Sequence, residues 1–94
     1  MKNIDLLVKE LSPEYSVRTI DGERVIYHKI NKFYDIEVSG LDNRKKSPNP
    51  VIYVWQLYPV EKIVETVELT DSLIHLVDTL SELRLKYAEE TLPD

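Results

Sequence analysis

The stretch DGERVIYHKINKFYDIEV, residues 21–38, contains two apolar runs with turn-forming residues before and between them, and it decides the fold. Asp21-Gly22 precedes the first run, and the central residues of a tight hairpin turn need the positive φ that this pair tolerates. In the second run apolar and acidic residues alternate, which is typical of a strand with one buried and one solvated face. Asn31-Lys32 supplies the turn between the runs. This pattern predicts a meander of three antiparallel strands at residues 15–20, 24–30 and 33–39.

The next part of the chain predicts one or two further strands. Residues 40–50 hold turn-forming and charged residues with almost no apolar ones, so they are predicted to form a long loop. Residues 50–57 are apolar on both faces, as in a central strand. Residues 60–69 fit a helical period but are rich in β-branched residues. We favour a strand there, with a short helix as the alternative.

Amphipathic helices are predicted at both ends of the chain. Residues 4–11 place apolar side chains at i, i+3, i+4 and i+7, with Asn3 as N-cap and Ser12-Pro13 as the stop. Residues 71–89 keep helical spacing for four turns or more. We predict a single domain, residues 1–94, of the α+β class: an N-terminal helix, an antiparallel four- to five-stranded sheet and a long C-terminal helix, with both helices packed on one face. The expected core contains Ile4, Leu7, Leu11, Val25, Ile36, Val54, Leu73, Val77 and Leu80.

Length, charge and cysteine content exclude several classes of function. A chain of 94 residues can bury one compact core but no deep enclosed cavity. The chain has no cysteine, which removes disulfides, thiolate nucleophiles and cysteine-based metal sites. Its net charge is −5, so nucleic acids repel it on average. No window approaches the roughly 18 to 20 apolar residues of a membrane span, and no targeting segment is visible, so we expect a cytoplasmic protein without a membrane partner.

The residues best suited to catalysis lack the neighbours that catalysis needs. His28 has no Ser, Asp or Glu at a triad spacing and is predicted to be an exposed or edge-strand residue. Asp35 and Glu37 form a carboxylate pair, but a solvated sheet face explains them. There is no glycine-rich phosphate loop and no nucleophile or metalloprotease motif. We therefore expect no enzymatic activity, no cofactor and no metal site.

The predicted C-terminal helix carries the candidate binding surface. A polar stripe at i, i+4, i+7 and i+11 consists of Asp71, His75, Asp78 and Glu82. Such a stripe is present on any surface helix; it also suits a basic protein partner or, less well, a divalent metal. Among the aromatic residues, Tyr53 and Trp55 are predicted to lie in the core, whereas Tyr58 and Tyr87 are predicted to be exposed, as interface aromatics are. The predicted partner-binding residues are Asp71, His75, Asp78, Glu82, Tyr58 and Tyr87.

One short basic run favours a nucleic-acid role. Arg44-Lys45-Lys46 lies in the predicted long loop, and Tyr27 and Tyr34 are candidates for stacking on bases. Asp35 and Glu37 lie beside those tyrosines and would repel phosphate. Nucleic acid is therefore an unfavoured partner.

The N-terminal third resembles a known family. NIDLLVKEL at residues 3–11, followed by Tyr15-Ser16-Val17 and the meander, resembles the start of small phage-encoded anti-CRISPR proteins of the αβββα type. The resemblance covers about the first 40 residues, and neither residues 51–57 nor the long last helix match that family. It implies an inhibitor that occupies the DNA-recognition groove of Cas9 with acidic residues. No site residue carries over.

These observations favour a small non-enzymatic protein-binding domain. The leading hypothesis is a phage-type inhibitor of a host or defence protein, acting through an acidic surface on a partner with a basic one. The alternative is an immunity-type or self-associating bacterial interaction protein, with a homodimer among its forms. A single-stranded nucleic-acid binder is the third hypothesis.

Overall fold

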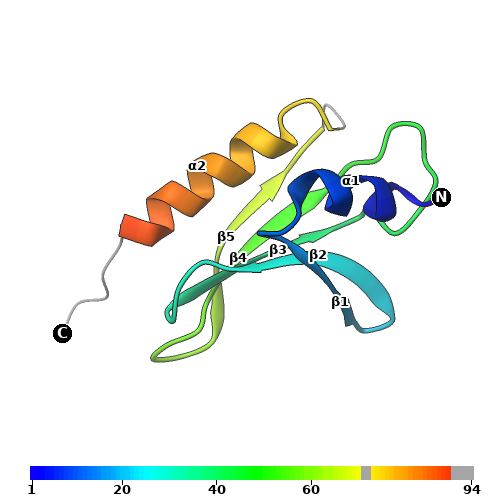
Figure 1. Cartoon of the computed structure of the whole chain (residues 1–94). Helices are drawn as coiled ribbons and strands as arrows, with labels where there is room; N and C mark the ends of the chain where they lie inside the picture. Colours follow the sequence, from blue (N-terminus) through cyan, green and yellow to red (C-terminus); the bar gives the residue numbers. More distant parts are fainter. Residues whose placement is uncertain (71–72, 90–94) are drawn as a thin grey trace.

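The computed structural model describes residues 1–70 and 73–89 of the chain. Its elements are α1 (Asn3–Leu11), β1 (Ser16–Ile20), β2 (Glu23–Lys29), β3 (Tyr34–Ser39), β4 (Val51–Gln56), β5 (Lys62–Glu68) and α2 (Leu76–Glu89). The strands form one antiparallel sheet in the order β1-β2-β3-β4-β5, so the meander extends through all five (Figure 1). This confirms the predicted α+β class, and the strand rather than the short helix at residues 60–69.

The local sequence signals place the strands accurately. Asp21 and Gly22 adopt φ of 52° and 83°, as the hairpin turn between β1 and β2 requires. β1 then pairs with β2 so that Ile20 lies opposite Glu23. The predicted strands 15–20, 24–30, 33–39 and 50–57 differ from the observed ones by no more than one residue at either end.

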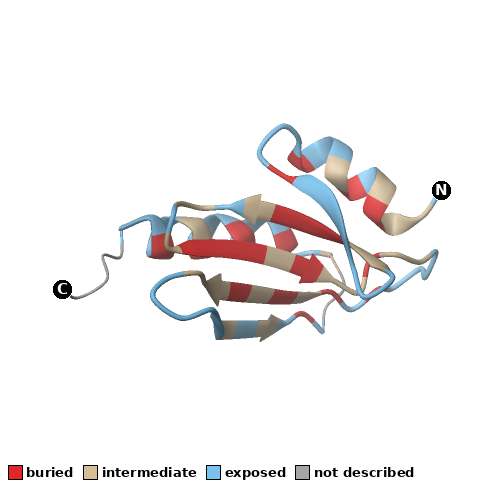
Figure 2. Ribbon diagram, turned by 90° about the horizontal axis from the view of Figure 1, so that it is seen from below, coloured by how far each residue is buried: buried red, intermediate tan, exposed pale blue. Residues whose placement is uncertain are grey.

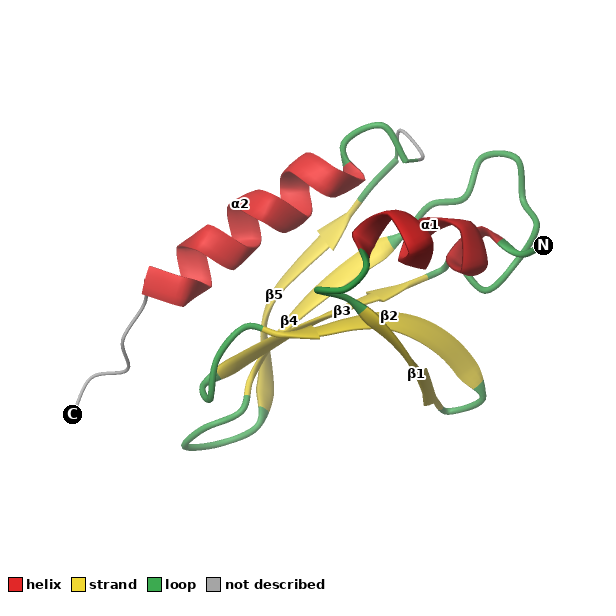
Figure 3. Ribbon diagram, in the orientation of Figure 1, coloured by secondary structure: helices red, strands yellow, loops and turns green. Residues whose placement is uncertain are grey.

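Both helices lie on the same face of the sheet, as predicted (Figures 1 and 3). Their apolar side chains pack against the inward-facing side chains of the central strands, and this layer is the core of the protein. Neither helix in the described ranges has the length and apolar composition needed to span a membrane. The fully buried members of the core are Ile4, Ile26, Ile36, Val38, Leu41, Ile52, Val54, Leu76 and Leu80.

The start of α2 and its buried side differ from the prediction. The helix begins at Leu76 rather than at residue 71. Its buried side chains are spaced i, i+4, i+7 and i+11: Leu76, Leu80, Leu83 and Tyr87. Val77 lies about 100° around the helix from Leu76 and is 49% exposed, so its predicted place in the core is wrong. Leu73 is half-buried against the core, and the other seven predicted core residues are buried.

A group of ion pairs holds α1 to the sheet and to the loop at residues 40–50. The guanidinium of Arg24 lies 2.9 Å from a carboxylate oxygen of Asp5 and 3.0 Å from one of Asp42. Lys2 adds a contact of 3.3 Å to Asp42. Hydrogen bonds from Arg24 lower the pKa of Asp42 to about 2. Every charge in this group therefore has a partner within the chain.

Candidate functional site

The sheet face opposite the helices, called the open face below, has no helix in front of it (Figure 2). It is concave, because the β1–β2 hairpin and the β4–β5 hairpin both bend away from the helix layer (Figure 1). The register brings acidic and aromatic residues side by side on it: Glu37 of β3 lies between Tyr27 of β2 and Tyr53 of β4, and Asp35 lies opposite Trp55. An irregularity in the pairing after Val54 places Ile63 of β5 opposite Trp55.

A hollow of about 360 Å³ lies on the open face. The side chains that line it come from all five strands and the first turn, and they include Glu23, Val25, Glu37, Tyr53, Trp55 and Ile63. Val25 is only 2% exposed, so the open face has buried apolar side chains of its own. The hollow therefore combines carboxylates with aromatic and aliphatic surface.

The surroundings of Glu37 disfavour the charged form of its side chain. Burial raises its pKa, and the negative charges of Asp35 and Glu23 raise it further. The indole N–H of Trp55, which forms no hydrogen bond of ordinary geometry among the described residues, lowers it by a smaller amount. None of the causes of this shift is a cation, so no described residue neutralises the Glu37 carboxylate.

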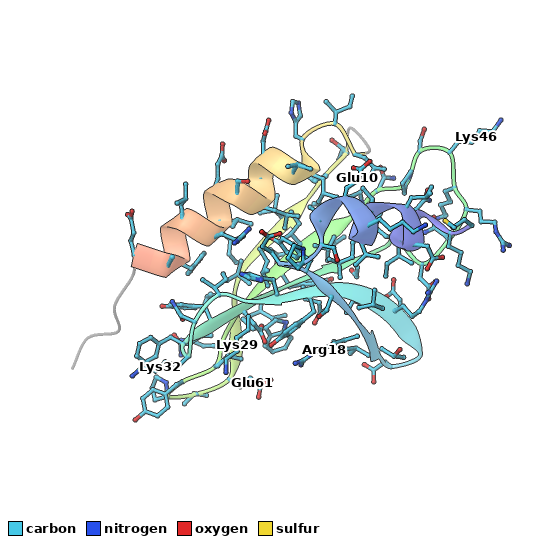
Figure 4. All side chains as sticks on the ribbon, viewed as in Figure 1. Glu10, Arg18, Lys29, Lys32, Lys46 and Glu61 are labelled. Carbon is cyan, nitrogen blue, oxygen red and sulfur yellow. The ribbon has the colours of Figure 1, made fainter. Side chains whose placement is uncertain are left out.

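Asp35 is buried more deeply, at 9% exposure, and its pKa is also raised, chiefly by burial. The hydroxyl of Tyr27 donates to it, and the charges of Arg18 and Lys29 oppose the rise in pKa while Glu61 adds to it. Figure 4 shows Arg18, Lys29 and Glu61 on the side of the sheet away from the helices. Within the described ranges, neither Asp35 nor Glu37 forms an ion pair.

The prediction that Asp35 and Glu37 lie on a solvated sheet face is therefore wrong. The alternation along β3 correctly places them opposite the apolar side chains of Tyr34, Ile36 and Val38. Asp35 and Glu37 are covered by large residues of the neighbouring strands. Pairing between strands is not visible in the sequence pattern of one strand. For the same reason Tyr53 and Trp55 line the open face, half-buried, rather than the core.

The predicted partner-binding residues do not form one surface. His75, Asp78 and Glu82 are exposed at α2, as predicted, and Asp71 lies outside the described residues. Tyr58 is 62% exposed, but it lies after β4 against Phe33. The prediction for Tyr87 is wrong, because it lies on the buried stripe of α2 and is 5% exposed.

Other chemical possibilities find less support in the arrangement. Tyr34 packs under α2 with its ring 4.8 Å from that of Tyr87, whereas Tyr27 lies on the open face, so the two tyrosines cannot stack bases together. Lys46 projects outward from the long loop (Figure 4).

His28 is half-buried against Tyr15 rather than exposed. No cluster of three or more His, Asp and Glu residues suited to a metal ion occurs in the part of the chain that the structure describes.

The chain matches no protein-family model, and it has no significant match among curated proteins or solved structures. The chemistry of the open face therefore carries the functional argument. Partly buried carboxylates beside aromatic rings suit a cationic group, because a guanidinium or ammonium pairs with the carboxylate and interacts favourably with the ring faces.

Proposed function

We propose that this chain is a non-enzymatic protein-binding domain whose open face receives a basic segment of a partner protein. The observation that carries the proposal is the Glu37 carboxylate, which lies in a hollow among aromatic side chains with no cation among residues 1–70 and 73–89 to neutralise it. An arginine of the partner fits this site best, because its planar guanidinium pairs with a carboxylate and stacks on an aromatic ring at the same time.

The free-energy cost of removing the Glu37 carboxylate from water is already included in folding. A cation that binds there is therefore attracted to a carboxylate that needs little further desolvation. Ile20 and Ile63 are 40% and 44% exposed beside the hollow and offer apolar surface to the rest of a partner segment. The net charge of −5 attracts a basic partner from a distance.

If the basic surface of the partner normally binds an anionic ligand, binding of this kind makes the protein an inhibitor. An acidic domain that occupies such a groove excludes the ligand by charge and by volume. This is also the mode of action that the resemblance to anti-CRISPR proteins implies, and we propose a host or defence protein as the target. Asp78 and Glu82 on α2 remain predicted contacts, but they lie on the opposite side of the sheet from the hollow.

The test is a titration of the ¹⁵N-labelled protein with short peptides, followed by backbone amide shifts. The probes are an arginine-rich peptide and a peptide of equal length with glutamate in place of arginine. We expect saturable shifts on the open face with the arginine peptide, weaker at high salt. Glu37→Gln should weaken binding about tenfold, since it removes a charged hydrogen bond. The matched control, Asp78→Asn with Glu82→Gln, removes two charges from α2 and should weaken it much less.

Two results would overturn the proposal. One is an arginine peptide that binds Glu37→Gln as tightly as the parent protein. The other is a set of amide shifts confined to α2, with the double variant losing affinity; that outcome would assign the function to the acidic stripe of the helix instead.

An exposed sheet edge favours self-association as the second candidate function. β5 is an edge strand, and Ile63 and Val64 on it are 44% and 36% exposed. An edge strand offers unpaired backbone groups to a second copy. Light scattering over a range of concentrations distinguishes this function: a dimer that persists at high salt and is lost in Val64→Lys supports it, whereas a monomer at all concentrations refutes it.

A further inference from the structure

A second depression lies on the helix side of the sheet, between α2 and the end of β2. It has a volume of about 400 Å³ and is lined by His28, Ile30, Ser81, Arg84, Leu85 and Ala88. It is separate from the open face, because the sheet lies between them. The lining combines three apolar side chains with three that can donate hydrogen bonds.

Arg84 is the charged residue of this cleft, and it has no acidic partner in the described part of the chain. Its side chain is partly buried, and the guanidinium carbon lies 5.6 Å from the centre of the Tyr15 ring. The aromatic ring holds the guanidinium in place without neutralising it. Arg24 and Lys86, in contrast, are paired with carboxylates.

Tyr15 lies next to Arg84 and has a buried hydroxyl. The residue is 4% exposed, and its buried hydroxyl forms no hydrogen bond of ordinary geometry among the described residues, although Arg84 lies close enough to act on it as a donor. A buried hydroxyl in this state is uncommon, because leaving it unpaired is unfavourable. The charge of Arg84 acts on the Tyr15 hydroxyl strongly enough to oppose the rise in pKa that burial causes, so the two groups are close together.

His28 adds an oriented ring to the cleft. Its Nδ1 lies 2.6 Å from the carbonyl oxygen of Glu14, so Nδ1 carries the proton and donates to that oxygen. Its ring centre is 5.0 Å from that of Tyr15. The other nitrogen, Nε2, has no partner in the described ranges. The side chain of Glu14 also acts on Tyr15, through its negative charge, which raises the pKa of that hydroxyl.

We propose that this cleft binds a small molecule that carries an oxyanion, a carboxylate or a phosphate, on an apolar body. Arg84 pairs with the oxyanion, and the hydroxyl of Ser81 donates to one of its oxygens. Ile30, Leu85 and Ala88 hold the apolar part. This inference does not depend on the proposed function of the open face, since no residue is shared between the two sites.

The test uses benzoate, phenyl phosphate and benzyl alcohol as probes, each titrated into the ¹⁵N-labelled protein. We expect the two anions to give saturable amide shifts at the lining residues, and the tighter of the two assigns the class of oxyanion. Benzyl alcohol, which has the same ring without the charge, should bind at least tenfold more weakly. Arg84→Gln should weaken the anions about tenfold, whereas Arg44→Gln, an exposed arginine of the long loop, should leave them unchanged.

Removal of Arg84 also removes its contact with Tyr15, so Arg84→Lys is the second variant. Lysine retains the positive charge and should restore most of the affinity for the anions, with a melting temperature close to that of Arg84→Gln. The proposal is refuted if benzyl alcohol and benzoate bind equally well, or if Arg84→Gln and Arg44→Gln bind benzoate alike. It is equally refuted if Arg84→Lys binds no better than Arg84→Gln.

Discussion

Glu65, on the helix-covered face of the sheet, and Glu37, on the open face, are glutamates in opposite situations. Glu65 accepts hydrogen bonds from Lys86 Nζ at 2.8 Å and from the Tyr87 hydroxyl at 2.6 Å, and these lower its pKa. Glu37 has burial and two neighbouring carboxylates, which raise its pKa. The carboxylates that hold the helices to the sheet are supplied with cations by the chain itself. Glu37 has no such cation among the described residues, as expected if its cation belongs to a partner.

The difference has a consequence for stability. A carboxylate with a lowered pKa stabilises the fold when it is ionised, and one with a raised pKa destabilises it. Glu37 thus opposes folding at neutral pH. Residues that serve binding rather than stability are expected to behave in this way.

The largest predicted effect concerns the apolar side chains of the two faces. Leu80, 1% exposed on the buried side of α2, and Ile63, 44% exposed on the open face, are both replaced by alanine. Leu80→Ala should lower the free energy of unfolding by about 2–5 kcal/mol because it leaves a cavity. Ile63→Ala should cost less than about 1 kcal/mol because half of the side chain is already in water. Urea denaturation measures both, and equal losses would show that the open face is part of the core.

The next effect is a change in the free energy of unfolding that has opposite signs on the two faces. Glu65→Gln should lower the free energy of unfolding at pH 7 by about 1 kcal/mol, a modest value because Lys86 is more than half exposed. Glu37→Gln should raise it and increase the melting temperature, since the amide is not penalised by burial beside Asp35 and Glu23. Thermal and urea denaturation of the two variants provide the comparison. Destabilisation by both would contradict the contrast between the faces.

The smallest effect is the pH dependence of the gain from Glu37→Gln. Because the folded-state pKa of Glu37 lies above its unfolded value, the protonated form supports folding below the unfolded pKa, and that support is lost as the pH rises through the folded pKa. The variant and the parent should therefore be nearly equally stable at acid pH and diverge as the pH rises to neutrality. A difference that stays constant from pH 3 to pH 8 would show that packing, not charge, is responsible.

Much of the fold follows from local sequence signals. Asp21-Gly22 fixes the first hairpin, and the alternation in residues 33–39 assigns each side chain of β3 to a face. The sequence also predicts the C-terminal helix, but not which side of that helix packs on the sheet. Leu73, Val77 and Leu80 fit a helical stripe as well as Leu76, Leu80 and Leu83 do, and only packing on the sheet selects the second stripe.

The candidate sites are less accessible from the sequence than the fold. The surroundings of Glu37 depend on Tyr27 and Tyr53, which reach it through pairing with two other strands. The cleft at Arg84 depends on Tyr15 and His28, which are distant from it in the chain. Spacing along one element cannot reveal either set. A signal that was available is the excess of tyrosine in the predicted strands, next to the acidic residues of 33–39.

The most direct test of the contrast between the faces is a measurement of both pKa values in one sample, by NMR titration of the side-chain carboxyl carbons. From the ordinary value of 4.5, the account predicts that the pKa of Glu37 is raised and that of Glu65 is lowered. Addition of the arginine-rich peptide should then lower the pKa of Glu37 and leave that of Glu65 unchanged. A pKa of Glu37 at or below that of Glu65 in the free protein would contradict the claim that the open face holds a carboxylate without its cation.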